Sequence, residues 1–184
     1  ITINVLGDDT RTDLAQLDDP SIASVGKAAN GKVVILAQAD TVTLAGLSDG
    51  DAFGVTLLGA TYNFNVSGSD ASAIRSNIVD TINNDARFNA VVSAKAVSGG
   101  EDQFTLTALK LGVPFNATVS GGTSSVTTTT ANGLVVYTPN KDFFGQDTFA
   151  YTASNNLGDN SSYDSAIVTV TVTATNDGPV ANAD

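Results

Sequence analysis

The side chains that could do chemistry in this sequence are almost all aspartates. Only one of its 19 acidic residues is a glutamate, Glu101, and neither Cys nor His occurs. Without these two residue types, the usual zinc sites and the Ser-His-Asp and Cys-His nucleophile systems are excluded. Aspartate favours turns and loops, where several oxygens can converge on a hard cation such as calcium. The simpler alternative is that the acids only keep a β-rich protein soluble.

Pairs of carboxylates could also cleave a glycoside without a histidine. The candidate pairs are Asp49 with Asp51 and Glu101 with Asp102. Neighbouring side chains on a strand point to opposite faces, so Glu101 and Asp102 could not easily flank one bond. Asp49 and Asp51 also resemble half of a calcium loop, but the remaining acids of such a loop do not follow. We therefore predict no enzymatic activity.

Charge restricts the partners. The chain has 8 basic residues and a net charge of -11, which predicts no binding to nucleic acid or to an anionic membrane surface. No apolar run is long enough to span a membrane, so we expect no membrane insertion by this segment. The abrupt opening on a strand, ITINVL, indicates a piece of a longer chain. We expect that piece to be a monomer.

Two outer segments, residues 1–40 and 131–184, share one sequence pattern. Each alternates apolar and polar residues over short runs, as in ITINVL and SAIVTVTVTAT, with turn signals between the runs. The Asn30-Gly31 pair favours a tight hairpin. This pattern is typical of strands in a β-sandwich. The same segments hold 12 of the 19 acidic residues.

The middle segment, residues 41–130, reads as a β-β-α-β-β unit. Its helix is expected to have Ser69 as the N-cap and Asp70 in the first turn. An apolar stripe at helical spacing then follows: Ile74, Ile78 and Ile82. We expect the first and last strands of the unit to pair, and the run TSSVTTTT is interpreted as its exit.

Four aromatic residues alternate in strands of the middle segment. They could pack in the core, which we favour, or form a stacking platform for sugars. They are Tyr62, Phe64, Phe104 and Phe115.

A resemblance becomes specific at GLVVYTPNKDFFGQDTFAYTAS. This stretch, together with ITINVLGDDT, ANGKVVI and the closing TVTVTATNDGPVANAD, resembles the cadherin-like, immunoglobulin-like repeats of giant bacterial RTX adhesins. In such repeats the matching pieces are close neighbours, whereas here about ninety residues separate them. The resemblance therefore implies a discontinuous β-sandwich, residues 1–40 and 131–184, that hosts residues 41–130 as an inserted α+β domain. A strand near Leu36 should then pair with one near Val135. Loop tips tolerate such insertions.

The same resemblance implies calcium at the joints between consecutive domains. The closing segment matches the linker whose Asn and Asp oxygens bind the ion, and acids near the domain ends match further positions. The predicted metal ligands are Asp8, Asp9, Asp147, Asn176, Asp177, Asn182 and Asp184.

Together these observations predict a non-enzymatic structural link of an extracellular, bacterial cell-surface adhesin that functions in adhesion and biofilm. Its partners would be neighbouring domains of the same long chain, with calcium as the cofactor. The alternative is a ligand-binding module, in which the inserted domain or its rim loops bind a carbohydrate or a surface protein.

Overall fold

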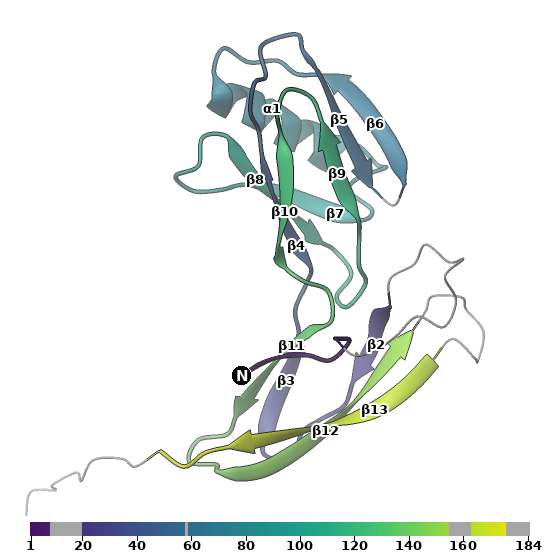
Figure 1. Ribbon diagram of the computed structural model, residues 1–184, viewed down its shortest axis with the longest axis vertical. Helices are drawn as coiled ribbons and strands as arrows, with labels where there is room; N and C mark the ends of the chain where they lie inside the picture. The colour runs from purple at the N-terminus through teal and green to yellow at the C-terminus, as the bar shows by residue number, and fades with distance from the viewer. Residues whose placement is uncertain (8–19, 58, 155–162, 176–184) are drawn as a thin grey trace, which may run out of the picture.

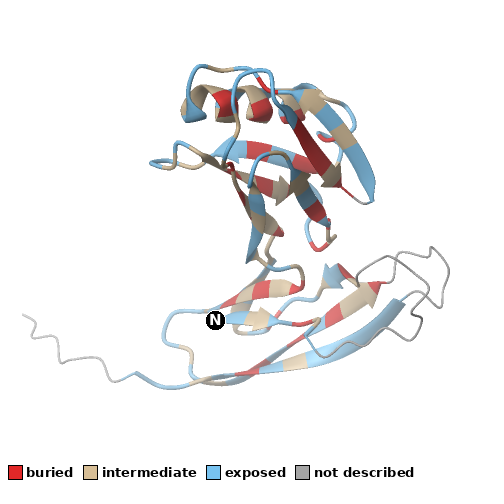
Figure 2. Ribbon diagram, turned by 45° about the horizontal axis from the view of Figure 1, so that its top comes forward, coloured by how far each residue is buried: buried red, intermediate tan, exposed pale blue. Residues whose placement is uncertain are grey.

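The computed structural model describes residues 1–7, 20–57, 59–154 and 163–175 of the chain. The described residues are mainly β, with a single α-helix among them. Every strand pairing is antiparallel, and the strands form four sheets. Buried residues gather in two separate places, one in each half of the molecule (Figure 2).

The lower half in Figure 1 is an Ig-like β-sandwich, hereafter the sandwich. One sheet has the order β1 (Thr2–Asn4), β11 (Leu134–Pro139), β3 (Gly31–Ile35). The other has the order β13 (Tyr163–Val172), β12 (Gly145–Ser154), β2 (Ser21–Val25). Their alternating apolar residues meet between the sheets. This core contains Val5, Ile22, Ala28, Val135, Tyr137, Phe149, Tyr151 and Val170.

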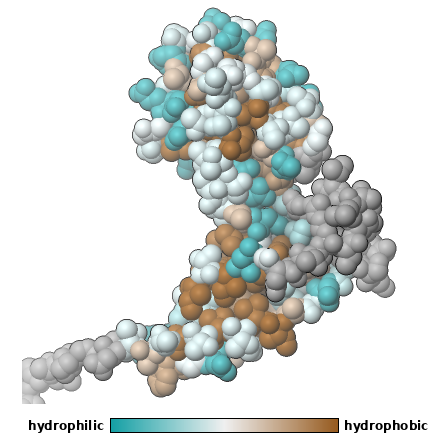
Figure 3. Space-filling model, in the orientation of Figure 1, coloured by the Kyte–Doolittle hydropathy of each residue, from teal (hydrophilic) through white to brown (hydrophobic). Residues whose placement is uncertain are grey.

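Strands far apart in the sequence pair within the sandwich. Val135 of β11 lies opposite Ile35 of β3, and the amide of Leu36 donates to the carbonyl of Leu134 at 2.9 Å. The expected pairing of the strand near Leu36 with the strand near Val135 is thus present. On the outer face of this sheet, Val34 and Val136 are register partners and leave apolar side chains in contact with solvent. Figure 3 shows apolar residues gathered on the visible face of the sandwich.

The upper half, hereafter the α+β unit, contains two further sheets and the helix (Figure 1). The first sheet has the order β10 (Ser125–Thr130), β4 (Ala39–Thr43), β8 (Gln103–Ala108), β7 (Val92–Ala96). The second has the order β6 (Ala60–Asn65), β5 (Ala52–Leu57), β9 (Ala117–Ser120). Among the described residues the unit has three strands before the helix and four after it, in place of the expected two on each side, and its outermost strands along the chain, β4 and β10, are paired. The Thr-rich run that was interpreted as an exit is strand β10.

Helix α1 (Ala71–Asn84) buries the predicted stripe, with Ile74, Ile78 and Ile82 all in the core. Its N-cap is Asp70 rather than Ser69, because the Asp70 carboxylate accepts a hydrogen bond from the Ala73 amide at 2.9 Å. At its other end, the side-chain amide of Asn83 donates to the Ala94 carbonyl and accepts from the Ala94 amide. This pair of bonds fastens the helix to β7.

The four aromatic residues of the middle segment confirm the core-packing interpretation. Phe104 and Phe115 are buried, and Tyr62 and Phe64 pack against the same core while partly exposed. The Tyr62 ring contacts Phe88 edge-on at 4.8 Å. The Arg87 guanidinium lies over the Tyr62 ring, 4.5 Å from its centroid. Because these contacts already occupy the rings, they do not form an open stacking platform.

Candidate functional site

Among the described residues, Asp147 near the start of β12 is the acidic side chain that accepts hydrogen bonds from the largest number of different residues, four. It is 4% exposed and accepts hydrogen bonds from both outer segments of the chain, residues 1–40 and 131–184. The Ala29 amide donates at 3.2 Å, the Asn30 amide at 2.8 Å and the Thr148 amide at 2.9 Å. The Tyr137 hydroxyl donates at 2.9 Å. The carboxylate therefore joins the β2–β3 turn, strand β11 and strand β12.

The Tyr137 ring occupies a place that only a glycine leaves open. A Cβ atom on Gly31 would lie 2.4 Å from the ring of Tyr137, which is a clash. The Asn30-Gly31 pair thus serves two purposes, since Asn30 supplies an amide to Asp147 and Gly31 makes room for the tyrosine. The turn, the ring and the carboxylate form one cluster.

The pKa shifts of Asp147 and Tyr137 agree with these hydrogen bonds. Burial alone would raise the pKa of Asp147. The hydrogen bonds from the Asn30 amide, the Tyr137 hydroxyl and the amides of Thr148 and Ala29 together outweigh it and hold the pKa below its ordinary value. For Tyr137, burial first and the hydrogen bond to Asp147 second raise the pKa of the phenol. Asp147 is therefore charged and Tyr137 neutral at neutral pH.

Of the predicted metal ligands, Asp147 lies within the described residues. Its four hydrogen bonds link the two sheets of the sandwich. Its role as a calcium ligand remains a prediction. Six predicted ligands lie outside the described residues: Asp8, Asp9, Asn176, Asp177, Asn182 and Asp184. Within the described part of the chain, no three acidic side chains gather closely enough to hold a metal ion.

The half calcium loop suggested by Asp49 and Asp51 is a pair of turn caps. Asp51 accepts a hydrogen bond from the Ser48 amide at 2.8 Å, and Asp49 accepts one from the Gly68 amide at 3.0 Å. Aspartates in turns often bond to nearby backbone in this way. These two carboxylates stabilise the loop between β4 and β5 and its neighbour before α1.

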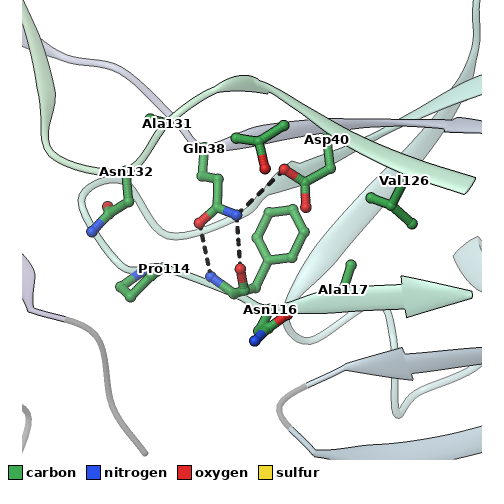
Figure 4. Close-up of a pocket in the computed structure, with 10 residues that line it drawn as sticks. Gln38, Asp40, Pro114, Asn116, Ala117, Val126, Ala131 and Asn132 are labelled. Carbon is green, nitrogen blue, oxygen red and sulfur yellow. Dashed lines mark hydrogen bonds between the residues drawn. The ribbon is translucent and has the colours of Figure 1, made fainter.

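A second cluster lies where the sandwich meets the α+β unit (Figure 4). The Gln38 side chain forms a fork with the backbone of Phe115, donating to its carbonyl at 2.7 Å and accepting from its amide at 3.0 Å. Beside it, Asp40 is buried, and a pocket opens next to both residues. Sequence reasoning did not single out Gln38 or Asp40, because neither belongs to a motif.

Two hydrogen bonds lie near this cluster, and the first of them connects the halves. The Ile22 amide of β2 donates to the Gly112 carbonyl at 2.8 Å. The Asn132 side chain donates to the Pro20 carbonyl at 2.7 Å. The loop before β9 and the connection between β10 and β11 therefore both contact the segment that leads into β2.

Comparison with known proteins gives one family. The sequence model of the bacterial Ig domain matches residues 69–173, which is more than half of the chain and runs from α1 to the end of β13. No curated protein matches the chain. No helix among the described residues is long and apolar enough to cross a membrane. Bacterial Ig domains are generally non-enzymatic structural modules and typically occur in extracellular surface proteins. With its Ig-like sandwich and this match, the chain belongs to the bacterial Ig domain family.

Proposed function

We propose that this chain is an extender link of a bacterial cell-surface adhesin, in which an Ig-like sandwich carries an inserted domain. The host would be residues 1–40 and 131–184, and the insert residues 41–130. The observation that carries the proposal is the pairing of β3 with β11 next to the pairing of β4 with β10. The chain leaves the sandwich and returns to it through neighbouring strands, as an insertion at a hairpin tip requires.

The Asp147 cluster supports the same proposal. Residues Ala29 and Asn30 come from the first outer segment, while Tyr137 and Asp147 come from the second. A sandwich held together by charge-assisted hydrogen bonds between its two segments does not depend on the residues between them. The α+β unit also has a hydrophobic core of its own.

Excision of the α+β unit tests the insertion. Leu36 would be joined to Leu134 by the dipeptide Asn-Gly, which favours a two-residue hairpin turn. We expect the shortened chain to give a β-type circular dichroism spectrum and a cooperative melting transition. A shortened chain that is unfolded, while the intact chain is folded, would contradict the proposal.

Calcium stiffening is the second part of the proposal. It rests on the resemblance of the closing segment to calcium-binding linkers and on the acid excess of the outer segments. The proposed ligands are the six predicted residues outside the described part of the chain: Asp8, Asp9, Asn176, Asp177, Asn182 and Asp184. Calcium accepts six to eight oxygens in irregular geometry, so two consecutive domains can share an ion.

The calcium experiment requires a neighbouring domain. Two copies of the chain, joined in tandem, would be compared in calcium and in chelator by small-angle scattering. We expect calcium to extend the tandem, and the joint variant Asn176→Ala, Asp177→Asn to abolish the extension. Equal scattering in calcium and chelator would refute the stiffening and leave the insertion proposal standing.

A further inference from the structure

A pocket of about 340 Å³ lies at the junction of the two units (Figure 4). Its apolar lining consists of Pro114, Phe115, Ala117 and Val126, polar groups make up the larger share of its surface, and Asp40 is the one charged residue among the described residues that line it. This volume lies at the small end of the range for ligand sites, which usually combine apolar walls with a few fixed polar groups.

The Asp40 carboxylate has one long hydrogen bond among the described residues. The residue is only 3% exposed, and its one hydrogen bond there comes from the Gln38 amide at 3.5 Å, the outer limit for such a bond. Neither of the ion pairs in the described part of the chain includes it. A cation that pairs with this carboxylate would replace water and one long hydrogen bond with a charge-assisted contact.

Two features define the surroundings of the carboxylate. Gln38 cannot swing away to serve Asp40 better, because both ends of its amide are held by the Phe115 backbone. On the neighbouring strand β10, Thr128 is the register partner of Asp40, and the pairing of β10 with β4 shifts register between Thr128 and Thr130. Such bulges interrupt pairing and redirect side chains, often next to binding sites. The backbone and the Gln38 side chain next to Asp40 are thus held by the fold itself.

We propose that this pocket binds a primary ammonium group on a short aliphatic stem. The ammonium would pair with the Asp40 carboxylate, and the stem would lie against Phe115 and Val126. A second acceptor is available at the wall, since the side-chain oxygen of Asn132 is buried and has no hydrogen-bond partner there. An ammonium group has three donors and no acceptor, which suits a site of acceptors.

An ammonium suits this site better than a metal ion. Calcium takes six to eight oxygens, usually with several carboxylates, whereas a single carboxylate lines this pocket. The net charge of -11 also favours the approach of a cationic guest. The same chemistry is offered by a lysine side chain of a partner protein and by a free alkylamine. This site is independent of the calcium joint proposed above, since it uses none of the same residues.

The first test uses the intact chain and the probe n-butylammonium, followed by amide chemical shifts in NMR. For a guest this small, we expect a Kd of about 1 mM, with shifts at Phe115, Asn116 and the residues around Asp40. The neutral analogue n-butanol has the same stem and no charge, and should not bind. Equal binding of n-butanol would overturn the proposal without any variant being made.

The second test uses Asp40→Asn, which keeps the shape and removes the charge. We expect it to weaken n-butylammonium binding by about tenfold or more, as for loss of a charge-assisted pair. The matched control Asp80→Asn removes the same charge from an exposed position on α1 and should bind like the parent. Undiminished binding by Asp40→Asn, or calcium shifting the same amides, would overturn the proposal.

Binding of Nα-acetyl-lysine methylamide would identify the source as a protein lysine, and binding of the free amine alone would identify a small amine.

Discussion

The hydroxyl of Tyr137 donates to the carboxylate of Asp147 at 2.9 Å, and this bond crosses from one sheet of the sandwich to the other. Tyr137 is fully buried and Asp147 nearly so. Each residue reinforces the state of the other, since the phenol supplies a donor to the charged carboxylate and the carboxylate keeps the phenol protonated. The stability of the sandwich should therefore depend on this pair.

Replacement of Asp147 by Asn should lower the melting temperature by several degrees. An amide cannot accept at both of its ends, so at least one of the backbone and hydroxyl donors would lose its partner. The control Asp142→Asn removes the same charge from an exposed turn, and Asn tolerates the positive φ there. Calorimetry that gave the two variants the same melting temperature would contradict the role assigned to Asp147.

Acid should destabilise the sandwich through the same carboxylate. Because the pKa of Asp147 is lower in the folded chain than in the unfolded chain, its stabilisation is complete above the unfolded value of about 3.9 and is lost as the pH falls further. The free energy of unfolding should fall below about pH 4, and less steeply in Asp147→Asn. Asp85 contributes in the same window, since its hydrogen bonds with Arg87 lower its pKa to about 2. The variant Asp85→Asn, which removes this second contribution, is therefore measured over the same pH range and compared with Asp147→Asn.

Gly112→Ala should weaken the contact between the two units. A Cβ atom there would lie 2.5 Å from the carbonyl oxygen of Ile22, at a φ of +74°. Gly99 has a similar φ of +80° with open space around it, so Gly99→Ala isolates the backbone strain, about 1 kcal/mol. We expect the Gly112 variant to cost more than that and to speed hydrogen exchange of the Ile22 amide, which donates to Gly112. Equal costs for the two variants would show that this contact carries no stability.

Ile78→Ala should destabilise the α+β unit by about 2–5 kcal/mol, because the side chain is fully buried in its core. The sandwich has a separate core, so its melting transition should not move. The reciprocal variant Phe149→Ala should lower the sandwich transition alone. Calorimetry in which either variant lowers both transitions by the same amount would show that the two units unfold as one.

Local patterns explain why much of the fold was predictable. The isoleucines of α1 recur at helical spacing and the sandwich strands alternate, so both the helix and the β-sandwich follow from periodicity. The Ig-like class came from the family resemblance. Strand β10 was missed because SVTTTT shows no apolar alternation and is held by its pairing with β4. The N-cap was misplaced by one residue because Ser69 and Asp70 are both good caps, and only the bond to Ala73 distinguishes them.

The sites were less predictable because their partners are distant in sequence. Asp147 was singled out as a cation ligand, yet its described partners include Asn30, which is 117 positions away. Gln38 is fastened to Phe115, which is 77 positions away. No local pattern reports such pairs, since they depend on which turns the fold brings together.

The adjacency of the two crossings between the units has a mechanical consequence. Residues 36–38 lead out of the sandwich and residues 131–133 lead back beside them. A pull on the two ends of the chain would act first on β1 and β13, which pair with β11 and β12, and the hydrogen-bonded ladder between β3 and β11 would keep the α+β unit out of this load path. That unit can therefore stay folded, with its pocket intact, while the strands beneath it carry the load.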